Sequence, residues 1–317
     1  MNRVGINVAL IVCDNGLGHL RRCCFMAFAL QEEGKSVTLF ASRLAFNRLK
    51  KSLPFISTLK LHDFSTHTSV KNFESGEERA REWLSRLPSL EAFDTVYSDN
   101  LLEILEVRSD AILSSQFFWH DAVKNVEPEY FLYCTQLLEK YRPKILGCDL
   151  FAMRSVREQP GYEPVSLYKN PELVTANMAV RRTERRDLLI TGGTTTSVRP
   201  ALKSLVAWFH DNPPDYFDKV RVDMELMPIS PPSHIVQADF TNAMFTRLAA
   251  AICRPGLGIL TDLLTVGVNP VTVFEAGNDE MLHNDWTLRS KGLVSSSLSL
   301  SKDKSIFSLG DGSFHIK

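Results

Sequence analysis

The chain has 317 residues, enough for two α/β domains of ordinary size, each with its own hydrophobic core. Hydrophobic residues make up 44% and charged residues 23%, a balance typical of globular proteins that excludes a disordered or fibrous chain. With 36 basic and 37 acidic residues the formal net charge is -1, so no general attraction for nucleic acid or anionic lipid is expected, and an anionic ligand must be held locally.

The first half of the sequence predicts alternating strands and helices. Residues 4–12 (VGINVALIV) are nearly continuous in apolar side chains, as in a strand buried on both faces of a parallel sheet. Residues 20–33 have apolar side chains at helical spacing and stop at Gly34, and residues 37–41 form the next strand. Further strands are predicted at residues 94–97, 111–118 and 144–148, with an amphipathic helix at residues 128–141. This alternation predicts a doubly wound parallel sheet.

The periodicity fades between about residues 151 and 186, where prolines and an arginine cluster favour a connection between domains. We place the boundary near residue 165, which gives an N-terminal domain at residues 1–165 and a C-terminal domain at residues 166–317.

The second half repeats the α/β pattern. It begins with a predicted strand at residues 187–191, a turn that contains Gly192 and Gly193, and a helix that ends near His210. Further strands are predicted at residues 220–226, 249–253 and 271–274. The tail from Ser295 is polar and rich in serine, so we expect poor order or a peripheral hairpin there.

The six cysteines lie mostly among apolar residues and form no C-x-x-C pair, so neither a zinc site nor a disulfide framework is predicted. The apolar segment at residues 6–13 lacks a basic leader and a small-residue cleavage site, and no run approaches the roughly 18 apolar residues that a transmembrane helix needs. We therefore expect a cytoplasmic protein with no transmembrane segment.

The first candidate motif is residues 13–22 (CDNGLGHLRR), which follow the first predicted strand. Gly16 and Gly18 let the backbone approach a ligand closely, and the start of a helix presents unpaired N–H groups to an anion. His19 stands at the helix start, and an imidazole titrates near neutral pH, which suits a general base for a hydroxyl or water. The structural alternative is a glycine turn capped by a polar side chain, with His19 only filling space.

The second candidate motif is residues 251–262 (AICRPGLGILTD), where a predicted strand again runs into glycines and a helix. Gly256 and Gly258 can place backbone donors against a phosphate. Asp262 falls about one turn into the helix, where a carboxylate can accept hydrogen bonds from the hydroxyls of a ribose. A carboxylate that only caps the helix is the alternative.

Together the two motifs resemble those of the two-domain nucleotide-sugar glycosyltransferases of the GT-B fold. The likeness extends to the N-acetylglucosaminyl transferase of peptidoglycan synthesis and the nucleotide-sugar hydrolase of pseudaminic acid synthesis, and it spans residues 5 to about 294. Gly16, Gly18 and His19 match a G-x-G-H turn, and Arg22 completes a G-H-x-x-R pattern like that of the hydrolase. The matching residues of the second half are Gly192, Gly193, Arg254, Gly256, Asp262 in place of glutamate, Gly267, Pro270 and Asn284.

The resemblance implies two doubly wound, Rossmann-like domains that face a cleft. The first would present a glycan, lipid-linked or small-molecule acceptor, and the second would bind a nucleotide-sugar donor, UDP-sugar first among the candidates. His19 would be the catalytic base of an inverting, metal-independent transfer that uses no cofactor. On the acceptor side the resemblance assigns Gly16, Gly18 and Arg22, and the ends of two strands add Asp99 and His120, for which capping or surface roles are the alternative. On the nucleotide side it assigns Gly192, Gly193, Arg254, Gly256, Gly258, Asp262, Glu280 and Asn284.

Some residues depart from the family pattern. Ile259 stands where a hydroxyl residue is usual, and Glu280 and Met281 stand where glutamines contact the donor sugar, so the identity of the sugar stays open. Asn269 is an additional residue, and the serine-rich tail offers no counterpart of the family's closing helix. Hydrolysis of the nucleotide sugar, or nucleotide-sugar binding with weakened catalysis, are therefore the alternative functions.

Overall fold

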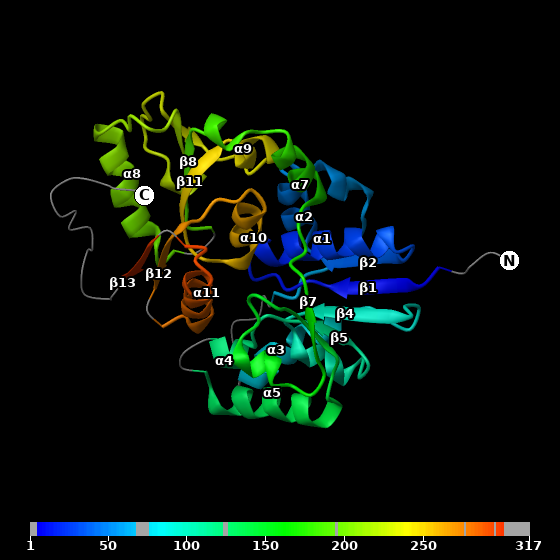
Figure 1. The fold of residues 1–317 in the computed structure, drawn as a ribbon. Helices are drawn as coiled ribbons and strands as arrows, with labels where there is room; N and C mark the ends of the chain where they lie inside the picture. The colour runs from blue at the N-terminus through cyan, green and yellow to red at the C-terminus, as the bar shows by residue number, and fades with distance from the viewer. Residues whose placement is uncertain are drawn as a thin grey trace. The chain divides into compact units, whose positions relative to one another are not determined.

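The computed structural model describes residues 5–67, 76–122, 126–193, 196–275, 277–294 and 296–300. The chain divides into two units, Met1–Tyr168 and Lys169–Lys317. Each unit is an α/β fold built on a parallel sheet (Figure 1). No helix within the described segments is long and apolar enough to cross a membrane.

In the first unit the described strands form a seven-stranded sheet in the order β3-β2-β1-β4-β5-β6-β7. The strands are β1 (Asn7–Ile11), β2 (Ser36–Ala41), β3 (Lys60–Asp63), β4 (Thr95–Asp99), β5 (Ile112–Ser114), β6 (Ile145–Cys148) and β7 (Tyr162–Val165). The helices are α1 (Leu17–Glu32), α2 (Arg43–Lys50), α3 (Gly76–Arg81), α4 (Trp119–Ala122), α5 (Pro128–Tyr141) and α6 (Arg154–Arg157), with 3₁₀ helices η1 (Pro54–Thr58), η2 (Glu82–Arg86) and η3 (Leu102–Glu106). This order confirms the predicted doubly wound sheet, because the chain builds outward from β1 in one direction and from β4 in the other.

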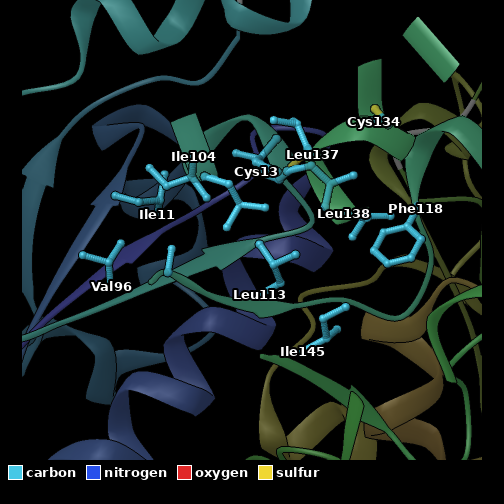
Figure 2. Close-up of a cluster of buried hydrophobic side chains, with 14 of the residues drawn as sticks. Ile11, Cys13, Val96, Ile104, Leu113, Phe118, Cys134, Leu137, Leu138 and Ile145 are labelled. Atoms are coloured by element: carbon cyan, nitrogen blue, oxygen red, sulfur yellow. The ribbon is translucent and has the colours of Figure 1, made fainter. Parts of the chain in front are cut away.

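The two faces of this sheet carry separate hydrophobic clusters, as the alternation of side chains along a strand requires. Val8 and Leu10 of β1 pack with the buried face of α1, whereas Ala9 and Ile11 belong to a cluster on the opposite face. In that second cluster, Leu137 and Leu138 of α5 lie near residues of β1, β4, β5 and β6 (Figure 2). The continuous apolar sequence of β1 is thus explained by helices on both faces.

Two edge strands of the first unit escaped prediction from the sequence. β3 reads Lys-Leu-His-Asp and is largely exposed, and β7 contains a proline, so neither shows the apolar pattern of a central strand. β5 is also shorter than the predicted strand at residues 111–118, because the chain turns away from the sheet after Ser114.

In the second unit the described strands form a six-stranded sheet in the order β10-β9-β8-β11-β12-β13. The strands are β8 (Asp187–Thr191), β9 (Lys219–Val222), β10 (Ile235–Gln237), β11 (Leu248–Cys253), β12 (Val271–Glu275) and β13 (Ser296–Leu300). The helices are α7 (Pro171–Met178), α8 (Arg199–Asp211), α9 (Asn242–Thr246), α10 (Leu257–Thr265) and α11 (Asp279–Ser290), with 3₁₀ helices η4 (Arg182–Glu184) and η5 (Met224–Leu226). Leu188 and Ile190 of β8 pack with the apolar face of α8 in the core of this unit.

The structure corrects three expectations for the second half. The segment expected to be a connection contains α7, and the predicted strand at residues 220–226 ends at Val222, so that Asp223 follows the strand. The start of the serine-rich tail does not form a hairpin, because β13 pairs in parallel with β12. The remainder of the tail, residues 301–317, lies outside the described residues.

Candidate functional site

The first candidate site lies at the carboxyl ends of β1 and β4. These two strands are neighbours in the sheet. From β1 the chain continues to β2 and β3 on one side, and from β4 it continues to β5, β6 and β7 on the other side, so the loops after β1 and β4 run in opposite directions. In doubly wound sheets ligands bind in the crevice at this point. His19 lies in the first turn of α1, directly after β1, and Asp99 is the last residue of β4. The topology therefore brings both to the place where a ligand is expected.

The turn between β1 and α1 is held by its own polar contacts. Gly16 precedes α1 with a φ of 97°, a left-handed conformation that favours glycine. The carboxylate of Asp14 accepts hydrogen bonds from the Ser65 hydroxyl at 2.5 Å and from the backbone N–H of Thr66 at 3.0 Å. The turn is thereby tied to the segment that follows β3, which fixes where α1 begins.

Asp99 joins two residues of α1. Its Oδ2 lies 2.8 Å from Nδ1 of His19, and its Oδ1 accepts a hydrogen bond from the guanidinium of Arg22. Because His19 and Arg22 are three residues apart, they lie on the same face of α1. The Asp99 side chain is fully buried, whereas those of His19 and Arg22 are each 12% exposed. The structure thus brings together three of the residues singled out in the sequence.

The charge of Asp99 follows from this arrangement. Burial by itself raises the pKa of Asp99, but the positive charge of Arg22 and the contact with His19 outweigh burial and hold the pKa below its ordinary value. Asp99 is therefore a carboxylate at neutral pH and draws the N–H of His19 to Nδ1. The lone pair of the imidazole is then on Nε2, where it can accept a proton.

Aromatic side chains from the segment after β5 surround His19. The ring centroid of Trp119 lies 5.9 Å from that of the imidazole, with an angle of 34° between the ring planes. The ring centroid of Phe117 lies 6.5 Å from that of the imidazole, in an edge-to-face arrangement. The two aromatic rings contact each other at 4.8 Å. Phe117 is buried, so the partly exposed Trp119 is the ring beside His19 that could pack on the apolar face of a ring-shaped ligand.

His120 lies in a different cluster from His19. Its ring stacks on Phe118 at 5.5 Å and meets the edge of Phe131 at 5.4 Å, and the residue is 7% exposed. Burial lowers the pKa of His120, which keeps the ring neutral. These contacts are those of a core histidine.

The second candidate site lies at the carboxyl ends of β8 and β11, which are neighbours at the corresponding point of the second sheet. Gly192 and Gly193 follow β8, and the second sequence motif follows β11. The two turns are joined, because the backbone N–H of Arg254 donates to the carbonyl of Thr191 at 3.1 Å. Sequence segments about 60 residues apart are therefore adjacent here, as expected of strands that flank a ligand crevice.

Arg254 is held by a carboxylate at the end of β12. Its guanidinium donates to both oxygens of Glu275, at 2.9 and 3.3 Å, and Asn278 donates to the same carboxylate at 3.3 Å. Burial acts to raise the pKa of Glu275, but Arg254 outweighs it and lowers the pKa. An anion that binds Arg254 must share this residue with Glu275.

The glycine turn of the second motif leads into α10. Gly256 precedes the helix without a side-chain cap, and no acidic residue lies in the first turn. The unpaired backbone N–H groups and the positive end of the helix dipole can therefore attract an anion. Asn284 supports the turn from α11, donating to the carbonyl of Pro255 at 2.9 Å. Asp262 lies within α10 and is 2% exposed, and Gly258 is partly exposed.

Glu280 lies in the first turn of α11, beside Asp279. The side chain of Asn278 caps this helix by accepting the N–H of Met281 at 3.1 Å. An acidic residue in the first turn also stabilises the helix, because its negative charge lies near the positive end of the helix dipole.

Two further carboxylates lie at the ends of strands in the second unit, and the sequence assigned a ligand role to neither. Glu275 is the last residue of β12, and Asp223 follows β9, where its Oδ2 accepts hydrogen bonds from Thr191 and Gly192. The signal that could have identified them is an acidic residue at the carboxyl end of a predicted strand, where ligands of parallel sheets bind.

No protein-family model and no curated protein matches this sequence. Solved structures do match over nearly the whole chain. LpCGTa in complex with UDP has a TM-score of 0.62 at 14% identity, covering 92% of this chain and 84% of its own. The glycosyltransferase SnogD from Streptomyces nogalater has a TM-score of 0.60 at 14% identity, covering 94% and 87%. MurG from Acinetobacter baumannii has a TM-score of 0.51 at 15% identity, covering 95% and 88%.

At these identities the likeness concerns the fold. Both units have the doubly wound parallel sheet expected of Rossmann-like domains, and the matched structures are glycosyltransferases. The chain therefore has the fold of the GT-B glycosyltransferases, as the resemblance in the sequence motifs predicted.

Proposed function

We propose that this protein transfers a sugar from a nucleotide-sugar donor, a UDP-sugar, to the hydroxyl of an acceptor. The observation that carries the proposal is the contact between His19 and Asp99 at 2.8 Å, at the point of the first sheet where ligands of this fold bind. The GT-B likeness supports the reaction class, and one matched structure, LpCGTa, is a complex with UDP.

In the proposed reaction Nε2 of His19 takes the proton of the acceptor hydroxyl. The acceptor oxygen forms a bond with the anomeric carbon of the donor as the bond from that carbon to the diphosphate breaks. The electron pair of the broken bond leaves with the diphosphate, and the proton passes from His19 to solvent. Asp99 stabilises the imidazolium that forms, as a carboxylate behind a catalytic histidine does. A single displacement inverts the anomeric configuration.

The first unit is assigned the acceptor. Trp119 lies beside His19 and, being partly exposed, offers an aromatic face to a sugar or an aglycone ring, while the buried Phe117 supports it from behind. A ring stacked there can direct a hydroxyl group to the imidazole. Gly16 and Gly18 leave the turn before α1 without bulky side chains.

We assign nucleotide binding to the second unit. The open start of α10 and the guanidinium of Arg254 would stabilise the diphosphate, and Asp262 would hold the ribose. Glu275 already binds Arg254, so a bound diphosphate would share the guanidinium with this carboxylate. Backbone N–H groups and arginine supply positive charge without a metal ion.

Hydrolysis is the second candidate. Arg22 completes the sequence pattern that resembles the pseudaminic acid pathway hydrolase, and in the structure it is the other partner of Asp99. Water would then take the place of the acceptor hydroxyl, with His19 in the same role.

The first experiment is a thermal-shift panel of UDP, GDP, CDP, ADP and dTDP. A ligand at 100 times its dissociation constant adds about 2.7 kcal/mol to stability. We expect a selective response to UDP, and no response to any nucleoside diphosphate would contradict the proposal. Sugar released from the matching donor without an acceptor identifies the hydrolase, and dependence on an added acceptor identifies the transferase.

A further inference from the structure

Asp223 lies against the first glycine turn of the second unit. Its Oδ2 accepts two hydrogen bonds, one from the Thr191 hydroxyl at 2.9 Å and one from the backbone N–H of Gly192 at 2.9 Å. The Thr191 hydroxyl in turn accepts the N–H of Gly193 at 3.2 Å. Because a hydroxyl has one proton, its donation to Asp223 directs its lone pairs toward Gly193. The carboxylate thus orders both glycines of the turn, one directly and one through Thr191.

The turn presents bare backbone to the ligand crevice. Gly193 is exposed, its φ is +61°, and a Cβ built on it would meet no atom within 4 Å. The N–H groups of both glycines are already bonded within the turn. A nucleotide can therefore approach this backbone closely, but these two groups serve the turn and not a phosphate.

Asp223 and Asp187, two buried carboxylates near opposite ends of β8, differ in their partners. Asp223 is 7% exposed and, among the residues that the structure describes, it has no cationic partner. At the other end of β8, Asp187 is also buried, but it contacts the guanidinium groups of Arg221 at 2.6 Å and Arg247 at 3.3 Å. Asp223 therefore depends on its hydrogen bonds to the turn, and the turn on Asp223, with no cation to take over this role.

We propose that Asp223 is a positioning residue for the nucleotide, holding the Thr191–Gly193 turn through Thr191 so that the bare backbone of Gly193 forms one wall of the nucleoside diphosphate site. This inference rests on the proposed function, because it concerns the same donor. In this arrangement Asp223 contacts the turn, and the backbone of Gly193 contacts the nucleoside diphosphate.

The test compares UDP binding by calorimetry across paired variants. Asp223→Ala and Thr191→Val remove the contacts that hold the turn, and each should weaken UDP binding by about tenfold, because binding must then also order the turn. Asp223→Asn and Thr191→Ser keep a side chain that can hold the turn, and each should bind UDP within about threefold of the wild type. Asp187→Asn is the matched control, because it alters a buried carboxylate at the opposite end of β8 from the turn and should leave UDP affinity unchanged.

Amide hydrogen exchange gives a readout that needs no nucleotide. Asp223→Ala should speed exchange at Gly192 and Gly193, whereas Asp187→Asn should not. If the wild type binds UDP and folded Asp223→Ala and Thr191→Val bind it equally well, or more tightly, the positioning role is wrong and the proposed function stands. If the wild type does not respond to UDP but exchange at the glycines still depends on Asp223, the proposed function is wrong and Asp223 orders the turn for another purpose.

Discussion

Nδ1 of His19 lies 2.8 Å from Oδ2 of Asp99, although 80 residues separate them along the chain. His19 lies in the first turn of α1, which follows β1, and Asp99 ends β4, so the contact depends on β1 and β4 being neighbours in the sheet. A buried carboxylate paired with both a histidine and an arginine sets the orientation of the imidazole, and three predictions concern this unit of the chain.

Replacing His19 with alanine removes the proposed base and its contact with Asp99, which keeps Arg22 as a partner. His19→Ala should lower kcat by roughly 10² to 10⁴, the usual contribution of a positioned acid or base. Affinity for UDP should stay unchanged, because the nucleotide residues belong to the second unit. Steady-state kinetics and calorimetry measure the two effects, and His67→Ala, at an exposed histidine of the same unit, is the control. Normal turnover by His19→Ala would leave the histidine with a structural role.

Asp99 is expected to act through His19, so the effects of their loss should not add. Asp99→Asn should lower kcat, and the double variant His19→Ala with Asp99→Asn should fall within about threefold of His19→Ala alone. Asp94→Asn, at the opposite end of β4, should retain wild-type kcat. A double variant slower by the product of both single effects would show that Asp99 works independently of His19.

Glu103 of η3 predicts a pH dependence of stability. The residue is 3% exposed, its Oε1 accepts a hydrogen bond from Tyr130 at 3.4 Å, and burial raises its pKa to about 7. Folding therefore favours the protonated acid. The stability that protonated Glu103 contributes is fully present below the ordinary carboxyl pKa and is lost as the pH rises through about 7.

Urea unfolding at about pH 5 and pH 8.5 tests this expectation. Between them the wild type should lose about 2.5 kcal/mol that Glu103→Gln does not lose, because glutamine stays neutral. Glu139→Gln, at an exposed position of α5, should follow the wild type. An equal change in the free energy of unfolding between the two pH values for the wild type and Glu103→Gln would contradict the role of this carboxyl group.

Asp262 tests the nucleotide half of the site. If its carboxylate binds the ribose, Asp262→Ala should weaken UDP binding by about 1.5 to 3 kcal/mol, the scale of hydrogen bonds to a charged group. Because the residue is 2% exposed, Asp262→Asn and the unfolding midpoint of both variants are measured alongside. A folded Asp262→Ala with wild-type affinity would leave Asp262 as a structural residue of α10.

Activity should not require a divalent metal. Arginine and the start of α10 would stabilise the leaving diphosphate without a cation. Turnover in EDTA should therefore equal turnover with added manganese. Activity that a chelator abolishes and manganese restores would contradict this prediction.

The sequence by itself determined the features that depend on neighbouring residues. Apolar periodicity located β1, α5 and β8, and the spacing of glycines before His19 placed this residue in the first turn of α1. These features are local because a helix or strand repeats every few residues, and a turn with a positive φ selects glycine. The motifs were therefore visible without coordinates.

Only the tertiary structure decided which distant residues meet. The order of strands places the end of β4 beside the end of β1, which joins Asp99 to His19, and the end of β9 beside the end of β8, which joins Asp223 to Thr191. Edge strands such as β3 also depend on their neighbours, since their own residues are polar. The physical reason is that backbone hydrogen bonds between strands are nearly independent of sequence, so partners are selected by packing across the whole sheet and not by local pattern.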